Sequence, residues 1–213
     1  VFAMLIMMKN VIGENLMLES GVSKCVLIAS GITIIYSSLR ACGEDSLKKR
    51  LAYSTIAHLS YIIYAGVLNI GIALIHFVAH ALMKIVLFMV AGMIQTMTKK
   101  SKISEMDGIG SALPKTFAVF TVSALGLIGL PPALGFLSKF FLLGSFPGNL
   151  DFLYGWIFII AGLLSGVYLF PIIVKGWFSK NKLKKINEEK GMLVPMILIA
   201  VSACIITFLG GGN

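Results

Sequence analysis

The stretch that decides the fold is residues 70–97, which read IGIALIHFVAHALMKIVLFMVAGMIQTM. It is long and apolar enough to cross a bilayer as one helix, because about 20 apolar residues span the hydrocarbon core. Basic side chains interrupt it at four-residue steps, at His76, His80 and Lys84. Such steps keep side chains on one face of a helix, so we predict a single polar stripe. A charge exposed to lipid at this depth is costly, and the stripe is therefore expected to face a bundle interior.

The composition is that of an integral membrane protein. Of the 213 residues, 58% are hydrophobic and 13% are charged, and the mean hydropathy is +0.95. So much apolar surface excludes a soluble globular domain. The formal net charge of +9 then indicates basic loops at a membrane surface rather than a nucleic-acid partner. Cys25, Cys42 and Cys204 are too scattered for a disulfide framework or a metal site, and we interpret them as small packing side chains.

The apolar stretches predict an all-α, polytopic transmembrane helix bundle with six complete spans plus a partial N-terminal one. The expected spans are residues 21–39, 51–69, 70–97, 114–146, 152–178 and 192–209, with residues 1–8 as the last turns of a preceding helix. Residues 40–50 are expected to form a charged loop. We predict one membrane domain, in which residues 1–20 are a remnant of that helix and an outer loop and residues 179–213 are a basic loop and the final helix. Because Val1 lies inside an apolar run, we expect the chain to be a fragment of a longer one.

Residues 114–146 are too long for one straight crossing and contain adjacent prolines, Pro131 and Pro132. Proline lacks a backbone donor and clashes with the preceding turn, so we predict one helix broken in mid-membrane. Backbone freed at that depth must be buried in protein or line a wet cavity. Lys139 follows the break by about two turns, where a titratable group would meet exposed backbone dipoles.

The distribution of basic residues predicts the orientation. When the loops alternate between the two sides of the membrane, fourteen of the 18 basic residues fall on one side. The other side holds only Lys9 and Lys24, while Lys84 and Lys139 lie within the membrane. Lysine and arginine accumulate in cytoplasmic loops. We therefore predict cytoplasmic basic loops and an outside C-terminus, in a prokaryotic inner membrane or, for a mitochondrial protein, the inner membrane of the organelle.

Five side chains are candidates for a proton relay: Lys84, Lys139, His76, His80 and His58. Lys84 has about 13 residues of helix on each side, too far for its stem to reach either interface. Burial favours a neutral amine, which lets a lysine exchange protons near neutral pH. A role other than proton relay stays open for four of them: the Lys139 amine could extend to the membrane interface, and the histidines could form hydrogen bonds that only stabilise the structure. The direction in which His58 faces stays open.

The nine acidic residues all lie in expected loops. Either a partner helix supplies a carboxylate or the membrane lysines are neutral part of the time. No Asp, Glu or Cys lies near the histidines to complete a metal site. The sequence contains no Walker loop, GxGxxG, HExxH, CxxC or nucleophile elbow, so no catalytic residue, metal or cofactor is predicted, and redox chemistry would come from partners.

Three motifs stand in order within about residues 40–144: LKKRLAYST at 47–55, HFVAHALMK at 76–84 and GLPPALGFLSK at 129–139. Together they resemble the antiporter-like, proton-pumping subunits shared by respiratory complex I, Mrp-type cation/proton antiporters and membrane-bound hydrogenases. The resemblance implies two inverted five-helix repeats, of which residues 21–178 match the second. It also implies that Lys84 is the central relay lysine and that Lys139 exchanges protons with the far side. His76 and His80 would belong to the polar axis between them.

Two positions depart from that family. His58 stands where a glutamine is common, and Ser46 stands where an acidic residue is common, with Asp45 one position away. The family's first repeat, with its Glu/Lys pair, is outside this chain.

The sequence thus predicts proton translocation by the C-terminal half of an antiporter-like subunit, through protonation and deprotonation of buried lysines. The expected partners are protons, the lipid bilayer and other membrane subunits of a redox-driven pump, which as a whole would have NADH dehydrogenase (quinone) activity. One alternative is a subunit of an Mrp-type antiporter that exchanges Na⁺ for H⁺. A second is a truncated, non-conducting structural membrane subunit.

Overall fold

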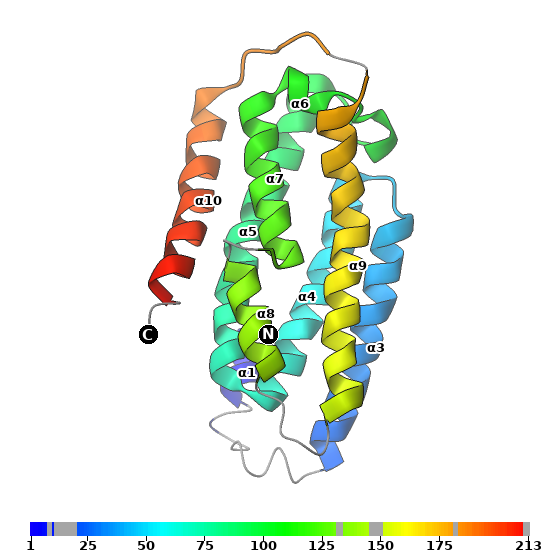
Figure 1. Ribbon diagram of the computed structural model, residues 1–213, viewed down its shortest axis with the longest axis vertical. Helices are drawn as coiled ribbons and strands as arrows, with labels where there is room; N and C mark the ends of the chain where they lie inside the picture. The colour runs from blue at the N-terminus through cyan, green and yellow to red at the C-terminus, as the bar shows by residue number, and fades with distance from the viewer. Residues whose placement is uncertain (8–9, 11–20, 131–133, 145–150, 181–182, 211–213) are drawn as a thin grey trace.

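The computed structural model is a bundle of helices (Figure 1). It describes residues 1–7, 10, 21–130, 134–144, 151–180 and 183–210. The elements are α1 (Phe2–Met7), α3 (Gly21–Gly43), α4 (Leu47–Leu68), α5 (Ile70–Thr98), η2 (Ile103–Glu105), α6 (Ile109–Ala112), α7 (Pro114–Ile128), α8 (Leu134–Gly144), α9 (Asp151–Phe178) and α10 (Lys190–Gly210). The predicted all-α class is confirmed.

Four helices in the described ranges are long and apolar enough to cross a membrane. They are α3, α4, α5 and the part of α9 from Trp156 to Phe178. Pro114–Ile128 and Lys190–Ile206 are shorter apolar helices. The count of six spans and the single broken helix therefore stay predictions.

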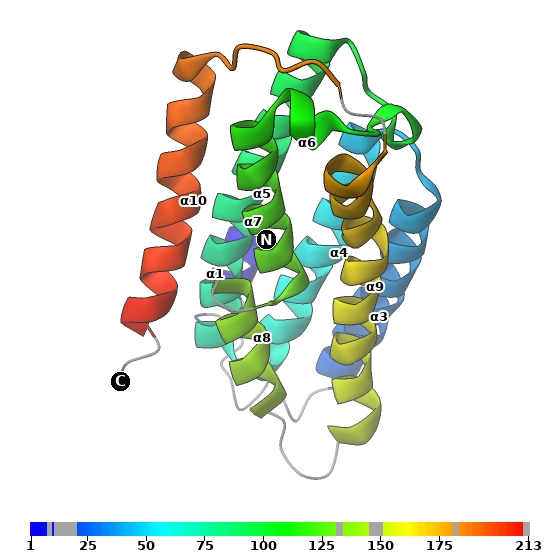
Figure 2. The ribbon, with the colours of Figure 1, turned by 45° about the horizontal axis from the view of Figure 1, so that its top comes forward.

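The helices form two groups around a shared interior (Figure 2). One group contains α3, α4 and α9, which contact one another, and the other contains α5 with α7, α8 and α10 packed against it. Helices α4 and α5 join the groups, because a tight turn at Asn69 makes them neighbours. The Asn69 side chain accepts a hydrogen bond of 3.1 Å from the Ile72 N–H, which satisfies a free donor at the start of α5.

Two apolar clusters fill this interior. One, near the end of the bundle that carries η2 and α6, includes Leu51 and Leu87. The other, toward the opposite end, includes Tyr61 and Ala73. The polar residues of α4 and α5 begin where the two clusters meet.

The connections 44–46 and 99–113 and residues 183–189 lie at one end of the bundle, opposite the α4–α5 turn (Figure 1). Basic residues expected on one side of the membrane lie in these connections, such as Lys99 and Lys184, and in the adjoining helix ends, such as Lys48 and Lys190. The predicted charged loop 40–50 is wrong in its extent, because α3 continues to Gly43 and α4 begins at Leu47. Arg50, counted there as a loop residue, lies in α4 with 9% of its surface exposed.

Backbone and side-chain hydrogen bonds join two of these connections. The Leu47 N–H donates to the Ser101 carbonyl at 3.0 Å, and the Ile103 N–H donates to the Asp45 carbonyl at 2.7 Å. The Asp45 carboxylate accepts from the N–H and the hydroxyl of Ser104, at 2.9 and 2.7 Å. These bonds from Ser104 hold the pKa of the Asp45 carboxyl below its usual range.

We expect Asp45→Asn to loosen this loop pair. Because the native pKa is depressed, the contribution of the carboxylate is complete above the pKa of an unfolded aspartate, about 3.9, and is lost as the pH falls through the lower native value. Amide hydrogen exchange at Leu47 and Ile103 should become faster in the variant at pH 7. Asp107→Asn is the matched control and should leave both amides unchanged; equal acceleration in the two variants would contradict the assignment.

Candidate functional site: a buried histidine and lysine cluster

The polar stripe of α5 faces the protein interior. His76, His80 and Lys84 are only 2, 4 and 5% exposed, although lipid-facing positions of the same helix such as Val78 and Ile85 are 47 and 49% exposed. Helices α4, α7, α8 and α10 all pack against α5. The four-residue spacing therefore places these basic side chains against protein and away from lipid.

A run of hydrogen-bonding groups connects α4, α5 and α8. His58 Nδ1 lies 3.4 Å from His76 Nε2, and His76 Nδ1 lies 2.8 Å from Ser138 Oγ. The rings of His58 and His76 are stacked with centroids 5.6 Å apart, and His58 also stacks on His80 at 5.1 Å. Tyr61 contacts His76 with ring centroids 4.7 Å apart. The three histidines predicted from sequence therefore form one cluster.

One set of tautomers gives every contact in this run a donor and an acceptor. In it, the Ser138 hydroxyl donates to the Gly135 carbonyl at 3.2 Å, and Ser138 Oγ accepts from His76 Nδ1–H. A neutral imidazole has one donor and one acceptor, which leaves His76 Nε2 to accept from His58 Nδ1–H. His58 Nε2 then carries a lone pair. A proton arriving there can be passed on, ring by ring, to Ser138.

Two atoms of the cluster have unused hydrogen-bonding capacity. His58 Nε2 and His80 Nδ1 are buried and have no hydrogen-bond partner among the described residues. Buried polar atoms without a partner are costly and are commonly satisfied by water. Each of the two atoms can form a hydrogen bond with a water molecule.

Lys84 is held by neutral acceptors of α4. Its Nζ donates to the Leu51 carbonyl at 2.9 Å and to the Ser54 hydroxyl. Ser54 also lies close to the hydroxyl of Tyr168, which donates to Ser165 Oγ at 3.3 Å. Polar groups thus continue from Lys84 across α4 to α9. Since these acceptors are uncharged, none of them fixes Lys84 as an ammonium ion.

The side chain of Lys139, a residue of α8, reaches the C-terminus of α7. Its Nζ donates to the carbonyls of Leu127 and Ile128, at 3.1 and 2.8 Å. These belong to the last turn of α7, where carbonyls lack partners within the helix and the helix dipole favours a positive charge. The amino group also lies 5.9 Å from the centre of the Tyr61 ring. The interruption between α7 and α8 is therefore what gives Lys139 its partners; Pro131 and Pro132 lie outside the described residues.

Gly129 leaves room for this arrangement. It ends α7 with φ at +100°, a conformation that only glycine adopts without strain. A Cβ at Gly129 would lie 2.9 Å from Lys139 Cδ. The backbone at this position requires glycine, and a side chain there would have to displace the stem of Lys139.

We therefore expect Gly129→Ala to displace Lys139 and to destabilise the protein by about 1–3 kcal/mol through backbone strain. The measurements are the thermal denaturation midpoint and proton flux through the assembled complex, and both should fall. Gly92→Ala in α5 is the control, because a Cβ there meets nothing within 4 Å. Equal behaviour of the two variants would show that the Lys139 contact does not matter.

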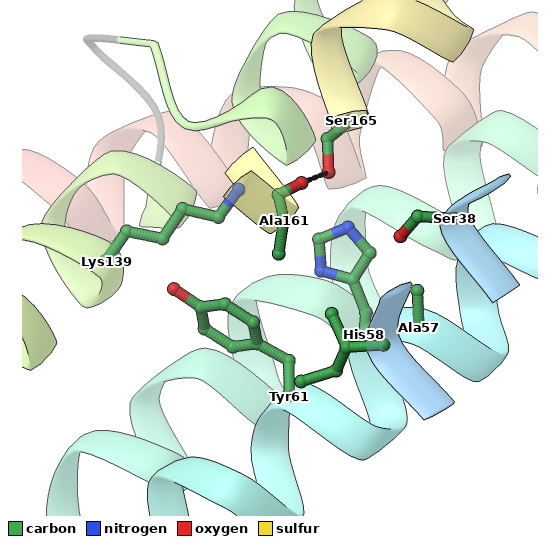
Figure 3. Close-up of a pocket in the computed structure, with 8 residues that line it drawn as sticks. Ser38, Ala57, His58, Tyr61, Lys139, Ala161 and Ser165 are labelled. Carbon is green, nitrogen blue, oxygen red and sulfur yellow. Dashed lines mark hydrogen bonds between the residues drawn. The ribbon is translucent and has the colours of Figure 1, made fainter. Parts of the chain in front are cut away.

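A small cavity joins Lys139 to the histidine cluster (Figure 3). It is lined by Ser38 of α3, His58 and Tyr61 of α4, Lys139 of α8 and Ser165 of α9, together with apolar neighbours. Its volume of about 10 Å³ is that of roughly one water molecule. Figure 3 shows the Lys139 amino group and the His58 ring reaching the same space from different helices. A single water there can connect groups that do not touch.

The structure gathers all five predicted site residues in the interior and adds others. Ser54, Tyr61 and Ser138 contact the predicted residues directly and were not singled out from sequence. A signal was present, because Ser54, His58 and Tyr61 follow one another at helical spacing on α4. Within the described ranges, no three His, Cys, Asp or Glu side chains are grouped to hold a metal ion.

The family profile described as NADH:quinone oxidoreductase/Mrp antiporter, TM, matches residues 2–168. The chain belongs to this family. The match covers α4, α5, α7 and α8 and therefore all five candidate residues. The predicted resemblance is confirmed, and so is the prediction that the chain is an antiporter-like integral membrane protein.

Curated relatives agree with this assignment. The chain is 34% identical over 196 residues to NAD(P)H-quinone oxidoreductase chain 4 2 of Thermosynechococcus vestitus, covering 84% of this chain and 37% of the relative. It is 30% identical over 197 residues to NADH-quinone oxidoreductase subunit N of Desulforudis audaxviator, covering 81% and 38%. It is 32% identical over 194 residues to NADH-quinone oxidoreductase subunit L of Rickettsia typhi, covering 87% and 29%. The chain thus spans well under half the length of these relatives.

Two solved structures share the fold. A chain of the membrane-bound sulfane sulfur reductase, an archaeal respiratory membrane complex, superposes with a TM-score of 0.82 at 22% identity, covering 89% of this chain and 40% of that one. A chain of the Mrp complex from a Dietzia species superposes with a TM-score of 0.79 at 15% identity, covering 88% and 44%. Each of these two chains is part of a complex.

Proposed function

We propose that this chain translocates protons as the C-terminal half of an antiporter-like subunit in a redox-driven membrane pump. The observation that supports this best is the run from His58 through His76 to Ser138, which begins at a cavity shared with Lys139. Each step of that run joins a donor to an acceptor within the bundle. Such a run can pass protons and holds no site for a larger substrate.

The proposed route has Lys84 and Lys139 at its two ends. Lys84 lies one helical turn from His80, which stacks on His58. A proton that leaves Lys84 reaches His58 through His80. From His58 it passes either through the cavity to Lys139 or through His76 to Ser138, the residue before Lys139 in the sequence. Deprotonating a lysine that already donates to carbonyls keeps part of its hydrogen bonding, so each amine can alternate between charged and neutral states.

Partner subunits complete this proposal. Residues 21–178 correspond to the second inverted-repeat unit, residues 1–20 to a remnant helix and outer loop, and residues 179–213 to a basic loop and the final helix. The chain crosses the membrane six times in this proposal, with α7 and α8 as the two halves of one broken helix. The basic loops then lie in the cytoplasm and the C-terminus lies outside. Oxidoreduction, and the charge changes that drive the lysines, would come from other subunits.

Lys139→Met tests the proposal in membrane vesicles that contain the chain with its partner subunits. Methionine keeps an unbranched side chain but lacks the titratable amine, so proton uptake coupled to substrate oxidation should fall about a hundredfold, the lower end of the range for a positioned proton-transfer group. Lys180→Met, at an exposed position, is the control and should pump normally. Unchanged pumping in Lys139→Met would favour a non-conducting structural subunit.

Exchange of Na⁺ for H⁺ remains the second candidate, because the matched family includes Mrp antiporters and an Mrp chain shares the fold. The same vesicles separate the two. Proton uptake that is unchanged between sodium-free and sodium-containing buffer supports the pump, whereas uptake that requires a sodium gradient supports the exchanger.

A further inference from the structure

An apolar groove runs along the outside of the bundle between α7 and α10. It has a volume of about 280 Å³ and is lined by Ala118, Val119 and Val122 of α7 and by Ile197, Val201 and Ile205 of α10, among others. Ala118 and Val201 are exposed, and Figure 2 shows α10 at the outside of the bundle, where it contacts α5 and α7. No residue that lines the groove belongs to the histidine and lysine cluster, and the groove has no part in the proposed proton route.

A basic pocket lies at one end of the same two helices. Its volume is about 390 Å³, and it is lined by Lys115 at the start of α7, by Lys190 at the start of α10 and by Lys185 in the connection before α10. All three lysines are exposed. The pocket therefore presents converging ammonium groups at the end of the bundle where the other basic connections lie.

The one carboxylate that lines this pocket is engaged elsewhere. Glu188 accepts hydrogen bonds from the Lys115 and Thr116 N–H groups at 3.0 and 2.7 Å and from the Thr116 hydroxyl at 2.6 Å. It therefore satisfies free donors in the first turn of α7. The three ammonium groups remain available to an anion from outside the chain.

The pocket and the groove follow one another along both helices. On α7, Lys115 is followed by Ala118, and on α10 the pocket residue Leu193 is followed by Ile197, so about one turn separates the two regions on each helix. The groove extends from Ile197 to Ile205, about 12 Å along the axis, against about 15 Å for half of the hydrocarbon core. A charged end and an apolar channel of this length match one leaflet of a bilayer.

We infer that α7 and α10 bind one anionic phospholipid of the surrounding membrane, with its phosphate among Lys115, Lys185 and Lys190 and one acyl chain in the groove. Basic pockets between membrane helices attract anionic headgroups in this way. A neutral isoprenoid such as a quinone would leave the three lysines without a partner. A helix of a partner subunit would fill the groove but would not account for the charge at its end.

The test uses the full chain with its partner subunits, reconstituted in phosphatidylcholine nanodiscs with increasing phosphatidylglycerol. Bound phosphatidylglycerol is counted by native mass spectrometry. One variant combines Lys115→Gln, Lys185→Gln and Lys190→Gln, and a matched control combines Lys48→Gln, Lys49→Gln and Lys180→Gln, which removes the same charge from exposed positions outside the pocket. A third variant, Ala118→Phe, fills the groove and keeps every charge.

We expect the pocket variant to lose about tenfold or more in affinity for phosphatidylglycerol, since each lysine near an anionic surface contributes a substantial attraction. Ala118→Phe should lose affinity as well, and the control should keep it. Equal loss in the pocket variant and the control would overturn the inference in favour of a general surface charge effect. It would also be overturned by full binding in Ala118→Phe, by inorganic phosphate competing as well as the lipid, or by a partner helix cross-linked along the groove at Ala118.

Discussion

Lys84→Met is expected to abolish proton translocation by the assembled complex. The substitution removes the amine that donates to Leu51 and Ser54 and leaves the end of the proposed route without a titratable atom. A positioned proton-transfer group typically contributes at least on the order of a hundredfold in rate, so pumping should fall by about that factor. Replacing a buried charge by an apolar side chain of similar length is often neutral or stabilising, so assembly should be preserved.

The measurement is proton uptake in vesicles, normalised to the amount of assembled complex. Lys99→Met is the matched control, because Lys99 follows the same helix but is exposed. Ser54→Ala keeps the amine but removes one of its acceptors, and it should slow pumping only several-fold. Normal pumping by Lys84→Met would refute the proposed role of Lys84, and poor assembly in both Lys84→Met and Ser54→Ala would point to a structural role instead.

Sequence reasoning predicted the helical class and the inward face of α5 because both depend on local pattern. Hydrophobic periodicity fixes which residues share a helix face, and the energetic cost of charge in lipid fixes where a lysine points. The direction of His58 depended on how α4 is rotated against α5, which packing decides. Leu51 and Tyr61, on either side of His58 along α4, belong to two separate apolar clusters. Packing of these clusters fixes the rotation of α4, and this rotation directs His58 toward His76 and His80.

The acceptors of Lys139 also lay beyond sequence reasoning. Its position after the prolines suggested exposed backbone dipoles, but which carbonyls it meets depends on how the start of α8 packs against the end of α7. The close approach is visible at Gly135, where an added Cβ would overlap the Gly126 carbonyl oxygen. Only the absence of a side chain there lets α8 pack against the end of α7.

Arg50 explains why the expected loop 40–50 is largely helical. Its guanidinium donates to the carbonyls of Glu44, Tyr168 and Cys42, at 2.8, 3.0 and 3.2 Å. Cys42 lies in the last turn of α3, where carbonyls need external donors. One charged side chain thus ties α3 and its following connection to α4 and α9. A cluster of charges in the sequence predicts a loop at such a residue, although its guanidinium forms its hydrogen bonds inside the protein.

Arg50→Ala is therefore expected to destabilise the bundle by about 3 kcal/mol or more, because hydrogen bonds to charged groups contribute about 1.5–3 kcal/mol each and their loss leaves buried acceptors unpaired. Arg50→Lys should recover only part of this, since an ammonium lacks the planar fork that reaches three carbonyls. The measurement is the thermal denaturation midpoint of the purified protein in detergent. Lys49→Ala, at the exposed neighbouring position, should fall within about 0.5 kcal/mol of the unaltered protein. If Arg50→Ala and Lys49→Ala have the same denaturation midpoint, the carbonyls of α3 and α9 find other donors, and the guanidinium does not hold these helices together.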